Sequence, residues 1–475
     1  MLALYNTLSH GKELFKSIKK KTVGLYSCGP TVYNFAHIGN LRTYIFVDLL
    51  KRVLAMDGYR VKHIMNITDV GHLTSDADSG EDKLEKGAAR ENRTVWAVAE
   101  FYTRAFKSDL KLLNIVPPSK YEKATANIKS QIALIKELEK KGFIYSSPIA
   151  VYFDTARDPN YGTFAGIKTN DQMEGAGART TGDVQIDSQK KHPADFVLWF
   201  KRVGKYKDHA MHWPSPWGDG FPGWHIECSA ISMKYLGETF DIHTGGIDHI
   251  GTHHVNEIAQ SENATGKKFV NYWLHAAFLN VEGEAKMAKS GDNFITLKSV
   301  MDQGFSPLDY RYLTLTAHYR SSLSFSWENL KAAKTARANL MAQISRFKEL
   351  AKTDKKASDG EKDLEKEYSL RFNDALDDDL NVPQALAILW EVIRDKGLSS
   401  KAKLRLIYGF DKVFGLDLDK IKPVKLTSEV KKLIEEREKL RAYKQFVKAD
   451  LLRQRIEELG YRVEDTENGY IIYKI

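Results

Sequence analysis

The chain has 475 residues, of which 43% are hydrophobic and 28% charged, so it is long enough for more than one domain with a buried core. No apolar run approaches the roughly 20 residues of a membrane helix and the first residues lack a secretory pattern, which argues against a membrane protein and leads us to expect a soluble, cytoplasmic one. The formal net charge of +9 favours a polyanionic partner without requiring one.

The first 70 residues predict a strand, a helix and a second strand. Residues 22–28 form an apolar run, residues 41–57 repeat apolar side chains at helical spacing, and residues 60–68 again read as a strand. A strand–helix–strand unit of this length joins parallel strands. We therefore expect a parallel sheet of the nucleotide-binding type.

The middle of the chain interrupts this pattern. Helical spacing covers about 92–113 and 121–142, whereas residues 154–195 are rich in Gly, Asp, Thr and Lys and show little periodicity. Strands are expected again at 195–200 and 239–243. We interpret the loop-rich stretch as an insertion.

The last third of the chain predicts helices. Residues 307–455 show helical spacing almost throughout, with a charged surface connection at 351–362. The tail then places two β-rich runs around residues 467–469, which is typical of a β-hairpin.

The two cysteines, Cys28 and Cys228, lie in polar motifs far apart in the sequence. They give no disulfide framework and suit a reducing compartment. His253 and Glu257 stand four positions apart, so on a helix their side chains would share one face; the neighbouring His254 lacks this register. Two thiolates, an imidazole and a carboxylate form a plausible zinc shell. Taken separately, a free cysteine is usually a buried core residue, and a His–Glu pair on a helix is usually solvated.

Two short motifs indicate phosphate chemistry. Residues 37–40 read HIGN between the first strand and its helix, where the helix N-terminus favours phosphate and His37 and Asn40 add side-chain donors. Residues 286–290 read KMAKS, and Lys286 and Lys289 can close over a triphosphate and stabilise the transition state at its α-phosphorus. HIGN alone is as typical of a simple strand–helix turn, and a lysine pair alone is usually a solvated surface. The two motifs together are far less expected by chance.

These motifs resemble HIGH and KMSKS, the signatures of class I aminoacyl-tRNA synthetases, with Asn40 and Ala288 as departures. The longer stretches CGPTVYNFAHIGN, WPSPWGDGFPGWHIECSAI and FDIHTGGIDHIGTHHVNEIAQSE resemble, more narrowly, cysteinyl-tRNA synthetases. The resemblance implies an α/β fold: a Rossmann-type parallel-sheet catalytic domain split by an insertion, then a helical bundle and a small mixed α/β C-terminal anticodon-binding domain. The implied boundaries are 1–115 and 213–300 for the catalytic halves, 116–212 for the insertion, 301–350 for linking helices, 351–425 for the bundle and 426–475 for the anticodon-recognition domain.

The resemblance also implies roles for individual residues. It assigns zinc to Cys28, Cys228, His253 and Glu257, the cysteine pocket to Gly29, Thr31, Thr68 and Trp224, ATP to His37, Asn40, Gly246, Asp248, Lys286 and Lys289, and the anticodon to Arg441, Asp450 and Asp465. The last three lie in or beside a basic helical segment with interleaved aromatic rings, a composition that suits unpaired bases.

The implied reaction joins L-cysteine to tRNA(Cys) through a cysteinyl-adenylate made from ATP with Mg²⁺. Because cysteine differs from serine by one atom, a zinc ion that prefers thiolate would select the substrate. We expect a monomer without membrane contact. Two alternatives remain: a mycothiol-type cysteine ligase, whose relatives lack the tRNA-binding tail, and a catalytically inactive zinc-containing RNA-binding module, against which the two motifs argue.

Overall fold

The structure, a computed structural model, describes residues 1–71, 73, 82–166, 189–281, 294–354, 359–423, 426–466 and 469–474. The chain divides into two compact units. The first comprises Met1–Gln303, His318–Phe325 and Asp378–Leu380, and the second comprises Gly304–Ala317, Ser326–Asp377 and Asn381–Ile475.

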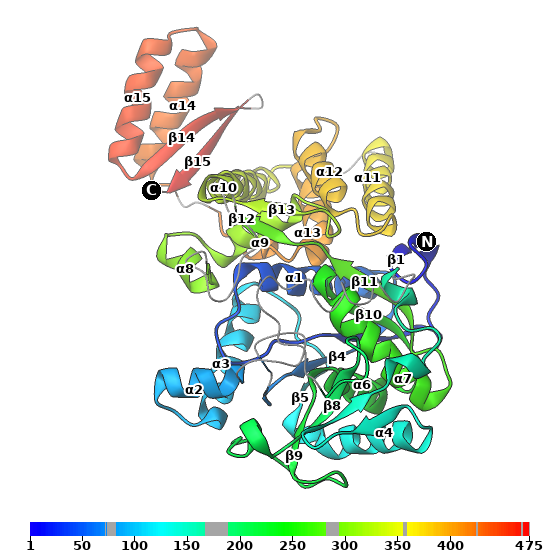
Figure 1. Cartoon of the computed structure of the whole chain (residues 1–475). Coiled ribbons are helices and arrows are strands. Elements are labelled where there is room, and N and C mark those ends of the chain that lie inside the picture. Colours follow the sequence, from blue (N-terminus) through cyan, green and yellow to red (C-terminus); the bar gives the residue numbers. More distant parts are fainter. Residues whose placement is uncertain are drawn as a thin grey trace. The chain divides into compact units, whose positions relative to one another are not determined.

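A five-stranded parallel sheet forms the centre of the first unit. Its strands are β3 (Thr22–Ser27), β4 (Arg60–Ile67), β5 (Lys120–Lys123), β10 (Phe240–Gly246) and β11 (Val270–Ala276). Their order is β11-β10-β3-β4-β5, so the early strand β4 and the later strands β10 and β11 share one sheet (Figure 1). The direction of strand addition reverses at β3, which is where ligands bind in open α/β sheets. The α/β fold expected from the sequence is confirmed.

The described part of the first unit also contains seven α-helices. They are α1 (Ile38–Met56), α2 (Lys83–Glu91), α3 (Val95–Leu112), α4 (Ile128–Lys140), α6 (Trp224–Leu236), α7 (Val255–Thr265) and α8 (Leu297–Asp302). The helix predicted at 121–142 is wrong in its first residues, because Lys120–Lys123 pair with β4 as the edge strand β5. Pairing along an existing strand outweighs the local helical pattern there.

An antiparallel sheet lies between the two halves of the parallel sheet in the sequence. Its strands, in spatial order, are β6 (Ile144–Ser146), β7 (Ala150–Phe153), β8 (Phe196–Lys201) and β9 (Gly220–Pro222). Two small pairs complete the first unit: β1 (Ala3–Asn6) with β2 (Gly11–Leu14), and β12 (Leu279–Val281) with β13 (Leu323–Phe325). Val151, Phe153 and Trp199 are fully buried in the core of the antiparallel sheet.

The second unit is helical and ends in the predicted hairpin. Its elements are α9 (Pro307–Leu315), α10 (Trp327–Leu350), α11 (Asp359–Asp377), α12 (Val382–Arg394), α13 (Ser400–Phe414), α14 (Ser428–Ala442), α15 (Phe446–Glu458), β14 (Tyr461–Thr466) and β15 (Gly469–Lys474). Phe372 stacks on Phe410 with ring centroids 3.9 Å apart, which joins α11 to α13. Among the described residues, no helix has the length and apolar character needed to cross a bilayer.

Candidate active site and metal centre

The proposed site residues of the first unit gather at one edge of the parallel sheet. Cys28 directly follows β3, Thr68 directly follows β4, and Gly246 is the last residue of β10. Because the carboxyl ends of parallel strands share one edge, three segments distant in sequence meet there.

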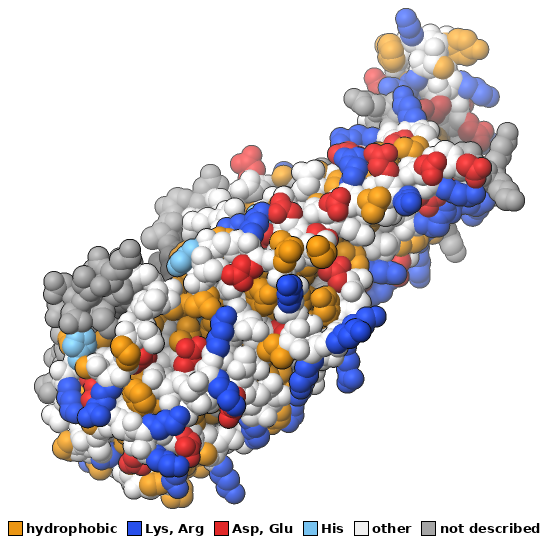
Figure 2. All heavy atoms as spheres, turned by 90° about the vertical axis from the view of Figure 1, so that its right-hand side faces the viewer, with side chains coloured by type: hydrophobic (Ala, Val, Ile, Leu, Met, Phe, Trp, Pro, Cys, Tyr) orange, Lys and Arg blue, Asp and Glu red, His pale blue; other side chains and the backbone are white. Residues whose placement is uncertain are grey.

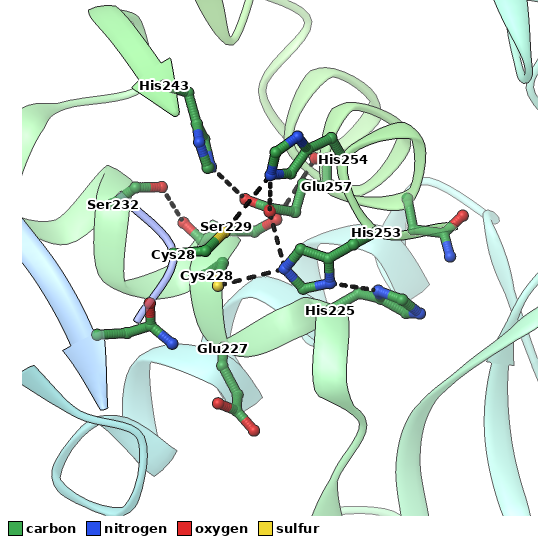
Figure 3. A network of polar contacts seen from close by, with 12 residues as sticks. Cys28, His225, Glu227, Cys228, Ser229, Ser232, His243, His253, His254 and Glu257 are labelled. Carbon is green, nitrogen blue, oxygen red and sulfur yellow. Dashed lines mark hydrogen bonds and ion pairs between the residues drawn. The ribbon is translucent and has the colours of Figure 1, made fainter. Parts of the chain in front are cut away.

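The four predicted metal ligands form a cluster (Figure 3). Cys28, Cys228, His253 and Glu257 each offer one donor atom, and these atoms lie within 4.8 Å of one another. Nε2 of His253 is 3.4 Å from Sγ of Cys228 and 3.0 Å from Oε1 of Glu257. His253 belongs to the π-helical turn Ile250–His254 that leads into α7, so the i,i+4 contact with Glu257 forms as the spacing predicted.

A second candidate set shares two of these residues. His243 and His254 join Cys28 and Glu257 in another group whose donor atoms lie within the same 4.8 Å. Nε2 of His254 is 3.4 Å from Sγ of Cys28, and Nε2 of His243 is 3.0 Å from Oε2 of Glu257. Sequence reasoning considered His254 but missed His243. The concentration of histidines between positions 225 and 275 was the available signal.

The electrostatics of the cluster favour a bound cation. Burial raises the pKa of both thiols, Cys28 and Cys228. Burial also opposes the charge on Glu257, but His243 and His253 outweigh it and lower the pKa of this carboxyl to about 2. Burial opposes the charge on His253 as well, yet Glu257 and Cys228 raise the pKa of its imidazole to about 10. A divalent cation would compensate the buried carboxylate and hold the thiols as thiolates. Sulfur, imidazole and carboxylate donors together fit Zn²⁺.

Outer contacts orient the imidazole rings. Nδ1 of His253 lies 2.9 Å from Nδ1 of His225, and Nδ1 of His254 lies 2.7 Å from Nε2 of His275. The hydroxyl oxygen of Thr7 lies 2.8 Å from Nδ1 of His275, within hydrogen-bonding distance. Such partners fix the ring that a ligating histidine presents to a metal.

The four residues assigned to the cysteine pocket lie at the ends of β3 and β4 and at the start of α6. The backbones of Thr31 and Thr68 pair, with Thr68 N–H donating to the Pro30 carbonyl at 3.1 Å. Trp224 begins α6, and its ring centroid lies 4.2 Å from that of His253. Gly29 follows Cys28 directly. The structure therefore brings these predicted residues to the same edge of the sheet as the metal cluster.

Gly29 is required by a close approach of two backbones, and Gly29→Ala should disrupt the pocket. An added Cβ would lie 1.6 Å from the carbonyl oxygen of Asn66, so β3 and β4 would have to move apart. We expect a destabilisation of roughly 1–3 kcal/mol and weaker cysteine binding. Gly24→Ala in β3 is the matched control, because its Cβ would meet Phe240 at an ordinary 3.5 Å. Urea unfolding and cysteine titration of both variants test this; equal behaviour would contradict it.

The HIGN residues lie at the start of α1. His37 is the N-cap, and its Nδ1 accepts a hydrogen bond from the Asn40 backbone N–H at 3.1 Å. The backbone N–H of Asn40, one of the first-turn donors expected to bind phosphate, is therefore already bonded to His37.

Gly246 ends β10, and Asp248 follows it two residues later. A Cβ on Gly246 would come within 2.4 Å of a carboxylate oxygen of Asp248.

Lys286 and Lys289 of KMAKS fall outside the described residues, but the chain on both sides of 282–293 is tied to α1. The N–H of Ile38 donates to the carbonyl of Ile295 at 2.9 Å. Arg42 in α1 is 3% exposed and donates to the carbonyls of Ala277 at 3.0 Å and Phe278 at 2.5 Å. The described residues 277–278 and 295, on either side of this stretch, are thus hydrogen-bonded to the first turns of α1.

Known proteins match this chain over most of its length and identify its family. Residues 14–335 match the family described as tRNA synthetases class I (C) catalytic domain, and residues 371–396 match the DALR domain. A cysteine–tRNA ligase from Treponema denticola is 46% identical over 488 residues, covering 98% of each chain. This chain belongs to the cysteinyl-tRNA synthetase family. Cysteine–tRNA ligase 1 of Burkholderia lata is 44% identical over 99% of this synthetase and 97% of its own length.

Solved structures support the fold of this synthetase. A Mycobacterium tuberculosis methionyl-tRNA synthetase bound by methionyl-adenylate superposes with a TM-score of 0.59 at 14% identity, covering 84% of this chain and 93% of that one. At this identity the likeness extends to the fold alone. The class I fold implied by HIGN and KMAKS is thereby confirmed.

The three residues assigned to the anticodon lie in the second unit of the synthetase. Arg441 in α14 and Asp465 in β14 form an ion pair at 2.9 Å, and the buried Arg437 also contacts Asp465. Asp450 in α15 instead pairs with Arg453 at 3.4 Å. On the face drawn in Figure 2, Lys and Arg side chains lie among Asp and Glu, so the net charge of +9 is not gathered into one patch there.

Proposed function

We propose that this chain activates L-cysteine with ATP and transfers the cysteinyl group to the 3′-terminal ribose of tRNA(Cys). One observation carries the proposal: a buried cluster of two thiols, imidazole and carboxylate lies at the sheet edge of a class I synthetase fold. The 46% identity to a cysteine–tRNA ligase supports it. The two free thiols suit the reducing cytoplasm, where we place the reaction.

In the first step, an oxygen of the cysteine carboxylate attacks the α-phosphorus of ATP. The bond from this phosphorus to the bridging oxygen breaks, and pyrophosphate leaves with the electron pair. His37 and Asn40 would stabilise the charge on the transferring phosphate, and Lys286 and Lys289 the charge on pyrophosphate. Mg²⁺ would accompany ATP. No side chain acts as a nucleophile, because alignment and charge stabilisation suffice.

In the second step, the terminal ribose hydroxyl of the tRNA attacks the carbonyl carbon of the adenylate. The hydroxyl releases its proton to solvent, and AMP departs with the electrons of the broken acyl–phosphate bond. Gly246 and Asp248 would hold the adenosine throughout, since glycine allows close approach and a carboxylate accepts from ribose hydroxyls. Arg441, Asp450 and Asp465 would select the anticodon.

We assign zinc to Cys28, Cys228, His253 and Glu257 rather than to the set with His243 and His254. The first set has two sulfur donors, which Zn²⁺ favours, whereas the second has one. When bound, zinc supplies a preference for a thiolate over a hydroxyl. Trp224 would close the pocket beside this centre, since its ring already lies against His253.

Cysteine-dependent exchange of pyrophosphate with ATP tests the first step, and aminoacylation of tRNA(Cys) tests the second. We expect both activities from the full-length, zinc-loaded chain. Absence of exchange would overturn the proposed function, and the inactive RNA-binding alternative would replace it. Exchange without aminoacylation would favour the mycothiol-type ligase.

A further inference from the structure

The turn that carries His253 has an uncommon backbone. The chain passes from the 3₁₀ turn Ile247–His249 through the π-helical turn Ile250–His254 into α7. A π turn spaces its backbone hydrogen bonds five residues apart instead of four, and such turns are rare and frequently lie at functional sites. This one presents Nε2 of His253 to Sγ of Cys228 and to Oε1 of Glu257 (Figure 3). Contacts that support the turn therefore bear on how His253 is held.

Asn256 supports one peptide unit of this turn. Its Nδ2 donates to the carbonyl oxygen of Thr252, four residues earlier, at 3.0 Å. That carbonyl belongs to the planar peptide bond between Thr252 and His253, so its direction sets the backbone on the N-terminal side of His253. Asn256 is 5% exposed, and Glu257 follows it directly. One buried amide is thus bonded to the peptide unit of one proposed zinc ligand and is adjacent in sequence to another.

Tyr161 orients that amide. Its hydroxyl donates to Oδ1 of Asn256 at 2.7 Å, and the Ala194 carbonyl lies farther from the same hydroxyl, at 3.4 Å. A backbone carbonyl can only accept, so the NH₂ end of Asn256 must face Thr252, and its oxygen therefore faces Tyr161. The amide and the carbonyl do not ionise. The orientation of the amide consequently does not depend on a protonation state or on a bound metal.

Tyr161 comes from a segment far from α7 in the sequence. It lies between β7 and β8 of the antiparallel sheet, and the short turn Thr163–Ala165 that follows it packs against the π-helical turn. We propose that Asn256 and Tyr161 are positioning residues that hold His253 in its place for zinc. This inference rests on the proposed function, because it concerns the zinc ion assigned there. It gives the connection between β7 and β8 a part in setting the geometry of the metal centre.

A matched pair of asparagines in α7 tests this role. Nδ2 of Asn263 donates to the carbonyl of Ala259 at 2.8 Å, which is the same bond to the fourth preceding residue but lies beyond the proposed ligands. Leucine resembles asparagine in size and lacks the amide. We expect Asn256→Leu to weaken zinc binding roughly 10- to 100-fold, as for other residues that orient a metal ligand, and Asn263→Leu to leave it unchanged. Competition with a chromophoric chelator, starting from the full-length, zinc-loaded chain, measures both affinities.

Tyr161→Phe removes only the hydroxyl. We expect it to weaken zinc binding less than Asn256→Leu does, and to add no further loss in the double variant, because both changes act through one amide. Tyr145→Phe is the control, since the Tyr145 hydroxyl bonds to Asp195 at 2.8 Å in the same antiparallel sheet. Should Asn256→Leu fail to fold, the comparison of these two phenylalanine variants carries the test, with only Tyr161→Phe expected to lower zinc affinity.

Two results would overturn the inference. One is an unchanged zinc affinity in Asn256→Leu, and the other is an equal loss in Asn256→Leu and Asn263→Leu, which would mean that the amides stabilise α7 in general. Zinc affinity is measured without any catalytic readout. Absence of cysteine-dependent exchange in the unaltered chain would therefore overturn the proposed function instead.

Discussion

Cys228→Ser is expected to remove most of the bound zinc and to lower the preference for cysteine over serine. The substitution replaces a buried sulfur donor in a cluster whose donor atoms lie within 4.8 Å. Loss of a residue that only supports a metal ligand lowers affinity by roughly 10- to 100-fold. Because Cys228 is itself a proposed ligand, we expect zinc affinity to fall by at least about 100-fold. Selectivity should then fall to the roughly 10- to 200-fold that shape provides for one small group. Metal analysis after dialysis and pyrophosphate exchange with each amino acid measure the two effects.

His243→Asn is the matched control, because His243 belongs only to the second candidate set. Cobalt substitution gives a direct readout, since thiolate-to-metal charge transfer reports the number of coordinating sulfurs. This absorption should fall in Cys228→Ser and persist in His243→Asn. If His243→Asn lost the metal while Cys228→Ser retained it, the ligands would be those of the second set. If selectivity survived the loss of zinc, the metal would not select the substrate.

Local patterns in the sequence predicted the first strand–helix–strand unit, β8, β10, most of the helical second unit and the terminal hairpin, but not the sheet strand β11 or the short strands β1, β2, β6, β7, β9, β12 and β13. The apolar runs at β3, β4 and β10 and the helical spacing of α1 predicted a parallel sheet, because buried strands and covering helices leave such patterns. They did not reveal β5, since Lys120–Lys123 are polar and form a strand only against β4. An edge strand depends on its partner more than on its own composition.

The same distinction applies to the site. Cys28, Cys228, His253 and Glu257 could be nominated because their donor types and the i,i+4 spacing are visible in the sequence. His243 was indicated only by the concentration of histidines between positions 225 and 275, because the register that sets it opposite Tyr26 determines its place beside Glu257.

Asp465→Asn is expected to weaken recognition of tRNA(Cys) while sparing pyrophosphate exchange. Loss of one specific base contact should raise the KM for tRNA roughly 5- to 150-fold, since such a contact contributes about 1–3 kcal/mol. Exchange requires no tRNA, and the residues that we propose for it lie in the first unit. Aminoacylation kinetics and exchange, measured on the same preparation, separate these steps. Glu464→Gln, the same chemical change at the neighbouring exposed position of β14, is the control.

The contacts of Asp465 with Arg437 make asparagine a better test substitution than alanine. Arg437 has a fully buried side chain and donates from Nη2 to both carboxylate oxygens of Asp465, at 2.8 and 2.7 Å. Asp465→Ala would leave Glu438, 2.8 Å from Nη1, as the remaining ion-pair partner of that buried guanidinium and would destabilise the fold. Asparagine keeps one oxygen for Arg437 and removes the charge. If Asp465→Asn lowered exchange as much as aminoacylation, Asp465 would act through the fold of the chain rather than through the anticodon.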